Sequence, residues 1–316
     1  MSTRRSVTAA AILVGSIGSL SLSLAPAVHA GASKAARPVE ATASLKEIGE
    51  DFEQLRALAG TPRSAAVAQA QQSLEQVLRG GLDGDQRAAA RFLAGTIAFE
   101  LGDFAHAGTQ FREAAGGLGD GPFADDAGFA AIEALEASGD DAGAAREWAK
   151  WEKRHPASPL VPVARLRLAW NALRRGQVAV GQKLLTALAV SHPWIAKDAR
   201  FTLAQATAAW QADKPADALA ILGPKPQGAP ALYLKALCLE KQGSLLKAAA
   251  AYQEVAERHP ETALRDPALL AKANTFLVAG DFRSAGEEFA RVGARVRDPG
   301  IRAESDLRRA GAVFLA

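Results

Sequence analysis

Sulfur-containing and aromatic residues are scarce in this sequence, and their scarcity removes several kinds of protein from consideration. The single cysteine, Cys238, cannot form a disulfide within the chain and cannot supply the grouped thiols of a zinc or redox motif. It lies in the apolar run 237–239, a setting typical of a small buried side chain. Aromatic residues make up only 6% of the chain, and no segment alternates Val, Ile and Thr between hairpin turns, so we expect no β-sheet.

The hydrophobic residues that are present favour helices. They make up 49% of the 316 residues and are mostly Ala, Leu and Val. Ala and Leu are among the best helix formers, and the small Ala side chain lets neighbouring helices approach closely. We therefore predict an all-α fold, in a chain long enough for one large domain or two ordinary ones.

The first thirty residues are typical of a bacterial export signal. Arg4 and Arg5 form a basic start, residues 7–24 are apolar and uncharged, and small residues at the end of the segment suit a signal peptidase. We predict a signal peptide over residues 1–30, cleaved after Ala30, and a periplasmic or secreted protein with no stable membrane span after cleavage. A retained membrane anchor is the alternative, and the paired arginines leave both the general secretory and the twin-arginine export routes open.

Charge is nearly balanced overall but uneven along the chain. Cleavage of the signal peptide removes two arginines and leaves 35 basic against 34 acidic residues, a net charge of +1. This balance gives no support to nucleic-acid binding. Residues 113–141 contain eight acids and no Lys or Arg, whereas residues 153–197 contain eight bases and no acid. The two segments either neutralise each other within the molecule or steer a charged partner, and head-to-tail self-assembly through them is a third hypothesis.

One pattern recurs along most of the chain: an apolar helix, a tight turn, and a second helix with Ala and a large apolar residue four positions apart. Ala107 with Phe111 and Ala248 with Tyr252 are examples of the paired residues. Glycine at the turn permits the left-handed backbone that ends one helix and lets the next begin. The turn positions are spaced by 37, 37, 37, 30 and 37 residues, and they are Gly102, Gly139, Gly176, Asp213, Gly243 and Gly280.

This arrangement resembles the tetratricopeptide repeat family, in its bacterial cell-envelope type. The family's unit is a helix–turn–helix with Gly at the turn, followed by Ala, an aromatic residue, Ala and Pro. Residues 88–316 carry the resemblance as six units and the start of an incomplete seventh, although only Gly95 matches the family's second Gly. The resemblance implies a right-handed superhelical solenoid of helix-turn-helix repeats that binds other proteins, with no enzymatic activity and no cofactor.

The segments around this array have their own expected structures. Residues 31–42 are predicted to be a disordered linker, and residues 43–87 a divergent N-terminal pair of helices. The second helix of the fourth unit should be short, because prolines crowd residues 223–230. Residues 306–316 read as a first helix without a partner, which suggests the front part of a longer protein, with a lone docking helix as the alternative.

Two motifs resemble functional sites but are predicted to be structural. Three joints between units carry His-Pro pairs, and such joints resemble those of bacterial envelope repeat proteins, including the superhelix of lytic transglycosylases. Because these histidines occupy the same position of the repeat, they should lie about two helix diameters apart. That distance is too great for them to share an ion, so we expect no metal site. The glycine-rich segment 116–121 follows a helix and lacks a Gly-Lys-Ser/Thr, so we expect a linker and not a phosphate loop. No catalytic set of nucleophile, histidine and acid can be assembled.

The resemblance also implies a concave groove, lined by fixed positions on the first helix of each unit, in which a partner binds. Aromatic and arginine side chains supply much of the binding energy at interfaces, although the same residues also fill cores. Counting back from each turn, the expected groove positions are Phe99, Glu100, Asp126, Glu133, Glu136, Trp170, Arg174, Arg200, Trp210, Tyr233, Lys241 and Asn274.

From these features we expect a non-catalytic scaffold of the bacterial cell envelope that binds another envelope protein or a peptide along this groove. Stacked helix pairs offer a long surface and no enclosed apolar pocket, which suits an extended partner better than a small substrate. The alternative is the N-terminal superhelical domain of a peptidoglycan lytic transglycosylase-like enzyme. In that case the chain would be a fragment, and its partner would be related to peptidoglycan.

Overall fold

The computed structural model describes four stretches of the chain, namely residues 72–80, 82–119, 121 and 123–316. The predicted signal peptide, the predicted linker and residues 43–71 of the predicted N-terminal pair lie outside the described residues. Within the described stretches every regular element is a helix and none is a strand, which confirms the prediction of an all-α repeat fold.

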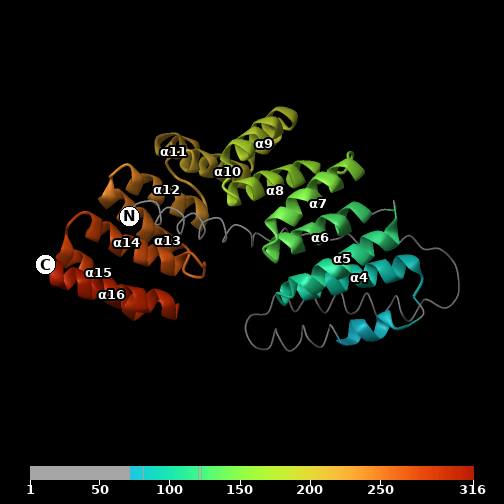
Figure 1. Ribbon diagram of the computed structural model, residues 1–316, viewed down its shortest axis with the longest axis horizontal. Coiled ribbons are helices and arrows are strands. Elements are labelled where there is room, and N and C mark those ends of the chain that lie inside the picture. Colours follow the sequence, from blue (N-terminus) through green and yellow to red (C-terminus); the bar gives the residue numbers. More distant parts are fainter. Residues whose placement is uncertain (1–71, 81, 120, 122) are drawn as a thin grey trace. The chain divides into compact units, whose positions relative to one another are not determined.

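Helices follow one another closely along the described chain (Figure 1). Residues 72–78 are helical, where the second helix of the N-terminal pair is expected to end. The elements that follow are α4 (Gly84–Glu100), α5 (Phe104–Leu118), α6 (Ala124–Ala137), α7 (Asp141–Arg154), α8 (Val161–Arg174), α9 (Val178–Ser191), the 3-10 helix η1 (Pro193–Lys197), α10 (Ala199–Gln211), α11 (Pro215–Leu222), α12 (Ala229–Lys241), α13 (Leu245–Arg258), α14 (Arg265–Val278), α15 (Phe282–Arg295) and α16 (Pro299–Leu315). From α4/α5 to α14/α15 they form six helical hairpins, and α16 follows the sixth.

Each hairpin turns at the position that the sequence predicts. The φ angles at the six turn residues lie between 63° and 90°, in the left-handed region. Asp213 occupies this conformation at the fourth turn, where the other five hairpins have Gly, and Asp is among the residue types that tolerate it best. After three of the glycines, an Asp carboxylate accepts the backbone N–H three residues later and caps the second helix; these caps are Asp103, Asp140 and Asp281.

Large side chains at two fixed positions pack the helices of a hairpin together. One lies ten residues before the turn and the other nine residues after it. The ring pairs at these positions are Phe92–Phe111, Phe129–Trp148 and Tyr233–Tyr252, with centroids 5.2, 4.6 and 5.3 Å apart. Gly95 makes room for the first pair, because a Cβ atom there would lie 2.7 Å from the ring of Phe111.

The fourth hairpin is short, as its prolines predict. Its second helix, α11, has 8 residues and ends at Leu222, after which Gly223 adopts a φ of 69°. The prolines that follow cannot continue a helix. The ammonium group of Lys235 on α12 donates a hydrogen bond to the carbonyl of Pro224 at 3.0 Å and holds this loop against the next hairpin.

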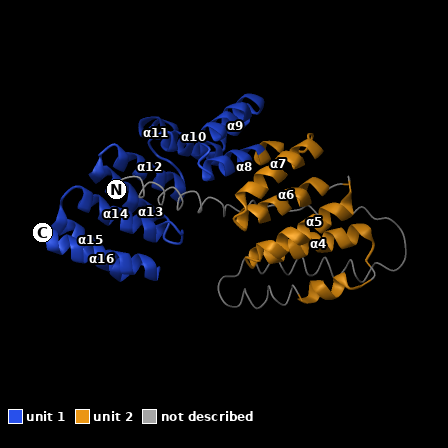
Figure 2. Ribbon diagram, viewed as in Figure 1, with its two compact units in different colours: residues 1–21, 165–316 blue, residues 22–164 orange. Residues whose placement is uncertain are grey.

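The described chain divides into two compact units, one ending at Ala164 and one beginning at Arg165 (Figure 2). We call the part that ends at Ala164 the first unit (orange, unit 2 in the key of Figure 2) and the part that begins at Arg165 the second unit (blue, unit 1 in the key). The first unit contains α4 to α7, and Phe129 and Trp148 are fully buried in it. The second unit contains most of α8 and all of α9 to α16. Its largest core cluster runs from Leu166 to Ala268, and a further cluster around Phe289 joins α14, α15 and α16.

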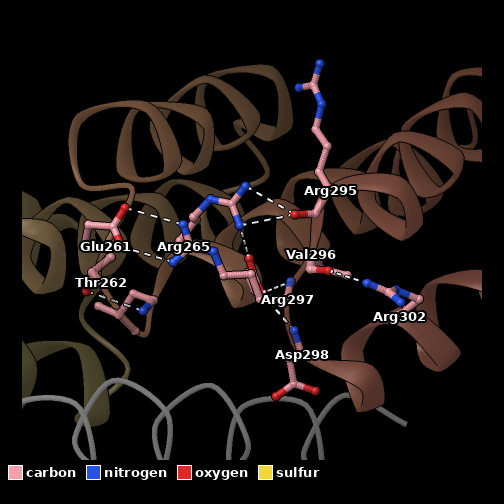
Figure 3. Close-up of polar contacts among 10 residues, drawn as sticks. Glu261, Thr262, Arg265, Arg295, Val296, Arg297, Asp298 and Arg302 are labelled. Atoms are coloured by element: carbon pink, nitrogen blue, oxygen red, sulfur yellow. Dashed lines mark hydrogen bonds and ion pairs between the residues drawn. The ribbon is translucent and has the colours of Figure 1, made fainter. Parts of the chain in front are cut away.

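An aspartate near the start of a first helix fastens the joint that follows its hairpin. Asp266, the second residue of α14, is 9% exposed and accepts hydrogen bonds from the backbone N–H groups of Arg297 at 2.6 Å and Asp298 at 3.1 Å (Figure 3). Asp125, the second residue of α6, has the same place in its hairpin and accepts a hydrogen bond from the Ser158 hydroxyl at 2.6 Å. In two joints, therefore, an aspartate at the same position of the repeat holds the chain by hydrogen bonds.

The histidines of the three His-Pro joints end helices. His155, His192 and His259 are the C-cap residues of α7, α9 and α13, and each donates its backbone N–H to the carbonyl four residues earlier. The proline that follows has no N–H and cannot extend the helix. The position gives these histidines a structural role in the joints.

Candidate partner-binding surface

The twelve residues that the sequence predicts for partner binding all lie on the first helices of hairpins. In the first unit they are on α4 and α6, and in the second unit on α8, α10, α12 and α14. Their surroundings differ. Trp170, Trp210 and Tyr233 are buried, and Lys241 is exposed. The other eight residues are half-buried, and they are Phe99, Glu100, Asp126, Glu133, Glu136, Arg174, Arg200 and Asn274.

The three large aromatic rings expected to contact a partner are packed in the core of the second unit. Trp170, Trp210 and Tyr233 are only 4%, 6% and 3% exposed. Tyr233 packs edge-on against Tyr252 of α13, and burial, aided by the charge of Glu240, raises the pKa of its hydroxyl. Because so little of these rings reaches the surface, truncating them would leave cavities and disturb the fold before it tested binding.

In the first unit, two predicted residues are engaged within their own hairpins. The ring of Phe99 lies edge-on to that of Phe104, with centroids 5.1 Å apart. Glu136 accepts a hydrogen bond from Nε1 of Trp148 at 3.2 Å. These contacts stabilise the α4/α5 and α6/α7 hairpins and leave only part of each side chain at the surface.

The other predicted residues of the first unit are acidic. Glu100 lies at the end of α4, and Asp126 and Glu133 lie on α6. Burial, together with the neighbouring carboxylate of Asp125, raises the pKa of Asp126 above its ordinary value. These helices therefore present acidic side chains at half-buried positions.

In the second unit, two predicted polar residues take part in specific contacts. Arg200 contacts the carboxylate of Asp198 at 2.5 Å at the start of α10, and this hydrogen bond holds the pKa of Asp198 below its ordinary value. Asn274 of α14 accepts a hydrogen bond at Oδ1 from Arg308 of α16 at 2.6 Å. Arg174, the last residue of α8, is half-buried.

Trp210 and Lys241 are the two predicted residues that the structure brings together. Lys241 Nζ lies 5.5 Å from the centre of the Trp210 ring, within the range of cation–π attraction, and 2.6 Å from Oδ1 of Asp213. The side chains of Lys241 and Asp213 are 35% and 80% exposed, so a partner can reach both. The Nε1 atom of Trp210 is buried and has no hydrogen-bond partner within the described residues. We call these three residues the Lys241 cluster.

Asp213 is absent from the site residues predicted from the sequence, which assigns it only to a turn. Its signal is a departure from the repeat: an acidic residue stands where the other five hairpins have Gly. Such a residue costs backbone energy that Gly would avoid, so it indicates a side-chain contact. The contact itself depends on the packing of α12 beside α10, which the sequence pattern does not specify.

No three His, Cys, Asp or Glu side chains converge into a metal-binding group among the residues described. In the same part of the chain, no helix combines the length and the apolar character needed to cross a bilayer. Burial raises the pKa of the Cys238 thiol to about 12, so this group is not a nucleophile at neutral pH.

Comparisons with known proteins agree with the repeat pattern. The family described as tetratricopeptide repeat matches residues 63–122, 166–229 and 223–263. The curated proteins include no match. A solved tetratricopeptide repeat protein from Parabacteroides merdae is similar at a TM-score of 0.62 and 13% identity, covering 85% of this chain and 99% of that one. Yeast Tom70 is similar at a TM-score of 0.46 and 14% identity, covering 96% of this chain and 69% of that one. The likeness to the first of these structures shows a shared fold.

Proposed function

Because the chain belongs to the tetratricopeptide repeat family, whose repeats are typical of protein–protein interaction scaffolds, we propose that it is an exported scaffold that binds a partner on its first-helix surface. The proposed partner is another protein of the bacterial cell envelope or an extended peptide. The proposed role is non-catalytic.

The Lys241 cluster is the observation that carries this proposal. An ammonium group is held between an aromatic face and a carboxylate, so its position is set before a partner arrives. Such preorganisation lowers the entropy lost on binding. A partner that brings a carboxylate to Lys241 and an N–H donor to Asp213 would replace solvent at both groups. Extended peptides have backbone N–H and C=O groups that are free to make such contacts.

Two substitutions that remove charge test this surface. Lys241→Gln removes the positive charge, and Asp213→Asn removes the negative charge while keeping a residue type that tolerates a positive φ. We expect each variant to recover at least about fivefold less partner than the wild type in affinity capture from envelope extract, a loss of roughly 1 kcal/mol of binding free energy.

Lys247→Gln is the matched control, because Lys247 is an exposed lysine on the second helix α13. It should retain capture, and all three variants should keep the helical circular dichroism and the melting temperature of the wild type. Undiminished capture by both Lys241→Gln and Asp213→Asn would show that the first-helix surface is not the binding site.

Export rests on the sequence of residues 1–30 and has its own test. N-terminal sequencing of the protein from a bacterial periplasmic or culture fraction should begin at Gly31. A chain that stays in the cytoplasm with Met1 intact would contradict the proposal of an envelope scaffold. The lytic transglycosylase alternative is tested by mixing the purified chain with peptidoglycan sacculi and sedimenting them. The proposed scaffold should stay in the supernatant, whereas co-sedimentation with the sacculi would favour the alternative, whose partner is related to peptidoglycan.

A further inference from the structure

The last helix has one face packed and the opposite face bare. Ser305 and Ala312 of α16 are fully buried, and the Ser305 hydroxyl donates a hydrogen bond to the carbonyl of Phe289 on α15 at 2.7 Å. These two residues are seven positions apart, so they mark one line along the helix, which faces α15.

A stripe of apolar residues runs along the other side of α16. Its members are Ala303, Leu307, Ala310 and Phe314, all exposed, with Leu307 at 75% and Phe314 at 89%. Each lies two residues before or after Ser305 or Ala312, which corresponds to about 160–200° around an α-helix. Their spacing of four, three and four residues is the seam of a helix that packs lengthwise against another helix. We call it the α16 stripe.

In the earlier hairpins, the same positions are covered. Counting back by the repeat, Leu307 corresponds to Tyr233 on α12 and to Leu203 on α10, which are 3% and 6% exposed. Ala310 corresponds in the same way to Ala236 and Ala206, both at 0%. Within its hairpin Tyr233 packs against Tyr252 of α13. A helix antiparallel to the first helix therefore covers this face in each of these hairpins, whereas no helix among the described residues covers it on α16.

We propose that the α16 stripe is a self-association surface, covered by α16 of a second copy of this chain in an antiparallel, two-fold symmetric pair. The inference is independent of the proposed partner of the Lys241 cluster. It rests on the fit of the stripe to itself. In a two-fold pair every contact occurs twice, so the surface must complement its own reversed sequence.

The α16 stripe meets that requirement. When two copies run antiparallel with the stripes centred on each other, Leu307 of one faces Ala310 of the other, and Phe314 faces Ala303. Each large side chain thus meets a small one, which lets the helix backbones approach closely and leaves no two large residues opposed. The paired helices also take the antiparallel orientation that second helices have within the hairpins.

A single pair of helices buries a modest area, so the expected dimer is weak. An α16 of 17 residues with four seam positions falls at the low end of interface sizes, below about 1,200 Å² in total. Contacts of that size form reversible complexes, so we expect a dimer with a dissociation constant of roughly 1–100 μM.

Sedimentation velocity over a concentration series tests the proposal. The wild type should shift from monomer to dimer across the micromolar range. Leu307→Asp with Phe314→Asp should weaken dimerisation by more than about tenfold, because each carboxylate would be buried against an apolar helix. Leu246→Asp is the control, since Leu246 on α13 is 76% exposed and lies off the stripe. At a concentration well below the dimerisation range, all variants should keep the wild-type melting temperature.

Cysteine cross-linking tests the register of the pair. Leu307→Cys chains mixed with Ala310→Cys chains should form a disulfide-linked dimer under mild oxidation, whereas either variant alone should form several-fold less, because each cysteine would face an unsubstituted position. The natural Cys238 is buried and should not contribute. A wild type that stays monomeric above the expected range overturns the proposal, and so does a dimer that survives the double aspartate substitution. A dimer that cross-links through 307 alone overturns the proposed register.

Discussion

The hydroxyl of Tyr252 on α13 donates a hydrogen bond to the carboxylate of Glu240 on α12 at 2.8 Å. Trp148 and Glu136 repeat this relationship in the α6/α7 hairpin at 3.2 Å, at the same distances from the turn. In both hairpins the donor is fully buried, and a buried donor without a partner would be costly. The Phe111 hairpin has no such donor, and there the Glu position is occupied by Phe99.

Tyr252→Phe should lower the free energy of unfolding by about 1.5–3 kcal/mol, the usual value of a hydrogen bond to a charged acceptor. Burial raises the pKa of Tyr252 well above its ordinary value, so the hydroxyl is protonated and available as a donor at neutral pH. Urea unfolding measures the change. A double-mutant cycle with Glu240→Gln isolates the pair, and a coupling energy near zero would show that the bond contributes nothing to stability.

Glu288→Gln should reduce stability in a pH-dependent way. Glu288 lies 2.9 Å from Lys272, with side chains 12% and 19% exposed, and it also pairs with Arg291. Desolvation acts to raise the pKa of Glu288, but the hydrogen bonds and charges of Lys272 and Arg291 outweigh it, so the pKa lies below its ordinary value of 4.5. At pH 7 we expect a loss of about 1–3 kcal/mol.

The sign of this pH dependence follows from the lowered pKa. The carboxylate stabilises the fold fully above the pKa of the unfolded chain, the ordinary value of 4.5, and the contribution disappears as the pH falls through the native value. The difference between Glu288→Gln and wild type in urea unfolding should therefore shrink below pH ~4. Glu287→Gln, on the same helix and 57% exposed, should change little at either pH. An equal loss for Glu288→Gln at neutral and acidic pH would contradict the assignment.

Asp266→Asn should loosen the joint between α15 and α16. The carboxylate of Asp266 accepts the N–H groups of Arg297 and Asp298 and contacts Arg265 at 2.6 Å. An amide has one acceptor oxygen and places its NH₂ group against one set of donors, so we expect a loss of about 1–3 kcal/mol. Hydrogen exchange should accelerate at the amides of Arg297 and Asp298. Exposed Asp217 on α11 supplies the control substitution to Asn, and unchanged exchange in Asp266→Asn would refute the bridging role.

Cys238 should be unreactive in the folded chain. Its side chain is 0% exposed, and burial raises the pKa of the thiol to about 12, so almost no thiolate forms at pH 8. Treatment with a thiol reagent such as dithionitrobenzoate should label the unfolded chain and leave the native chain unlabelled. Rapid labelling of the native chain would mean that α12 opens readily.

The amino-acid sequence by itself determined the elements and their order. The hairpin turns, from Gly102 to Gly280, need residues that adopt a left-handed backbone, and α11 ends early at Gly223. Both features depend on the conformational limits of single residues, so they can be predicted from the local sequence. The repeat also places all the predicted surface residues on the first helices, because the position of a residue within a hairpin follows from its distance in sequence to the turn.

Only the tertiary structure decided which of those side chains reach the surface. Trp210 and Tyr233 are expected in the groove from their positions on first helices, yet packing against neighbouring helices makes them core residues. The contact of Lys241 with Asp213 and the bare face of α16 likewise depend on which helix packs beside which. Such contacts join residues far apart in the chain, and their energies come from packing and desolvation. The local sequence pattern cannot predict them, because a core residue and a binding residue on a first helix recur with the same periodicity.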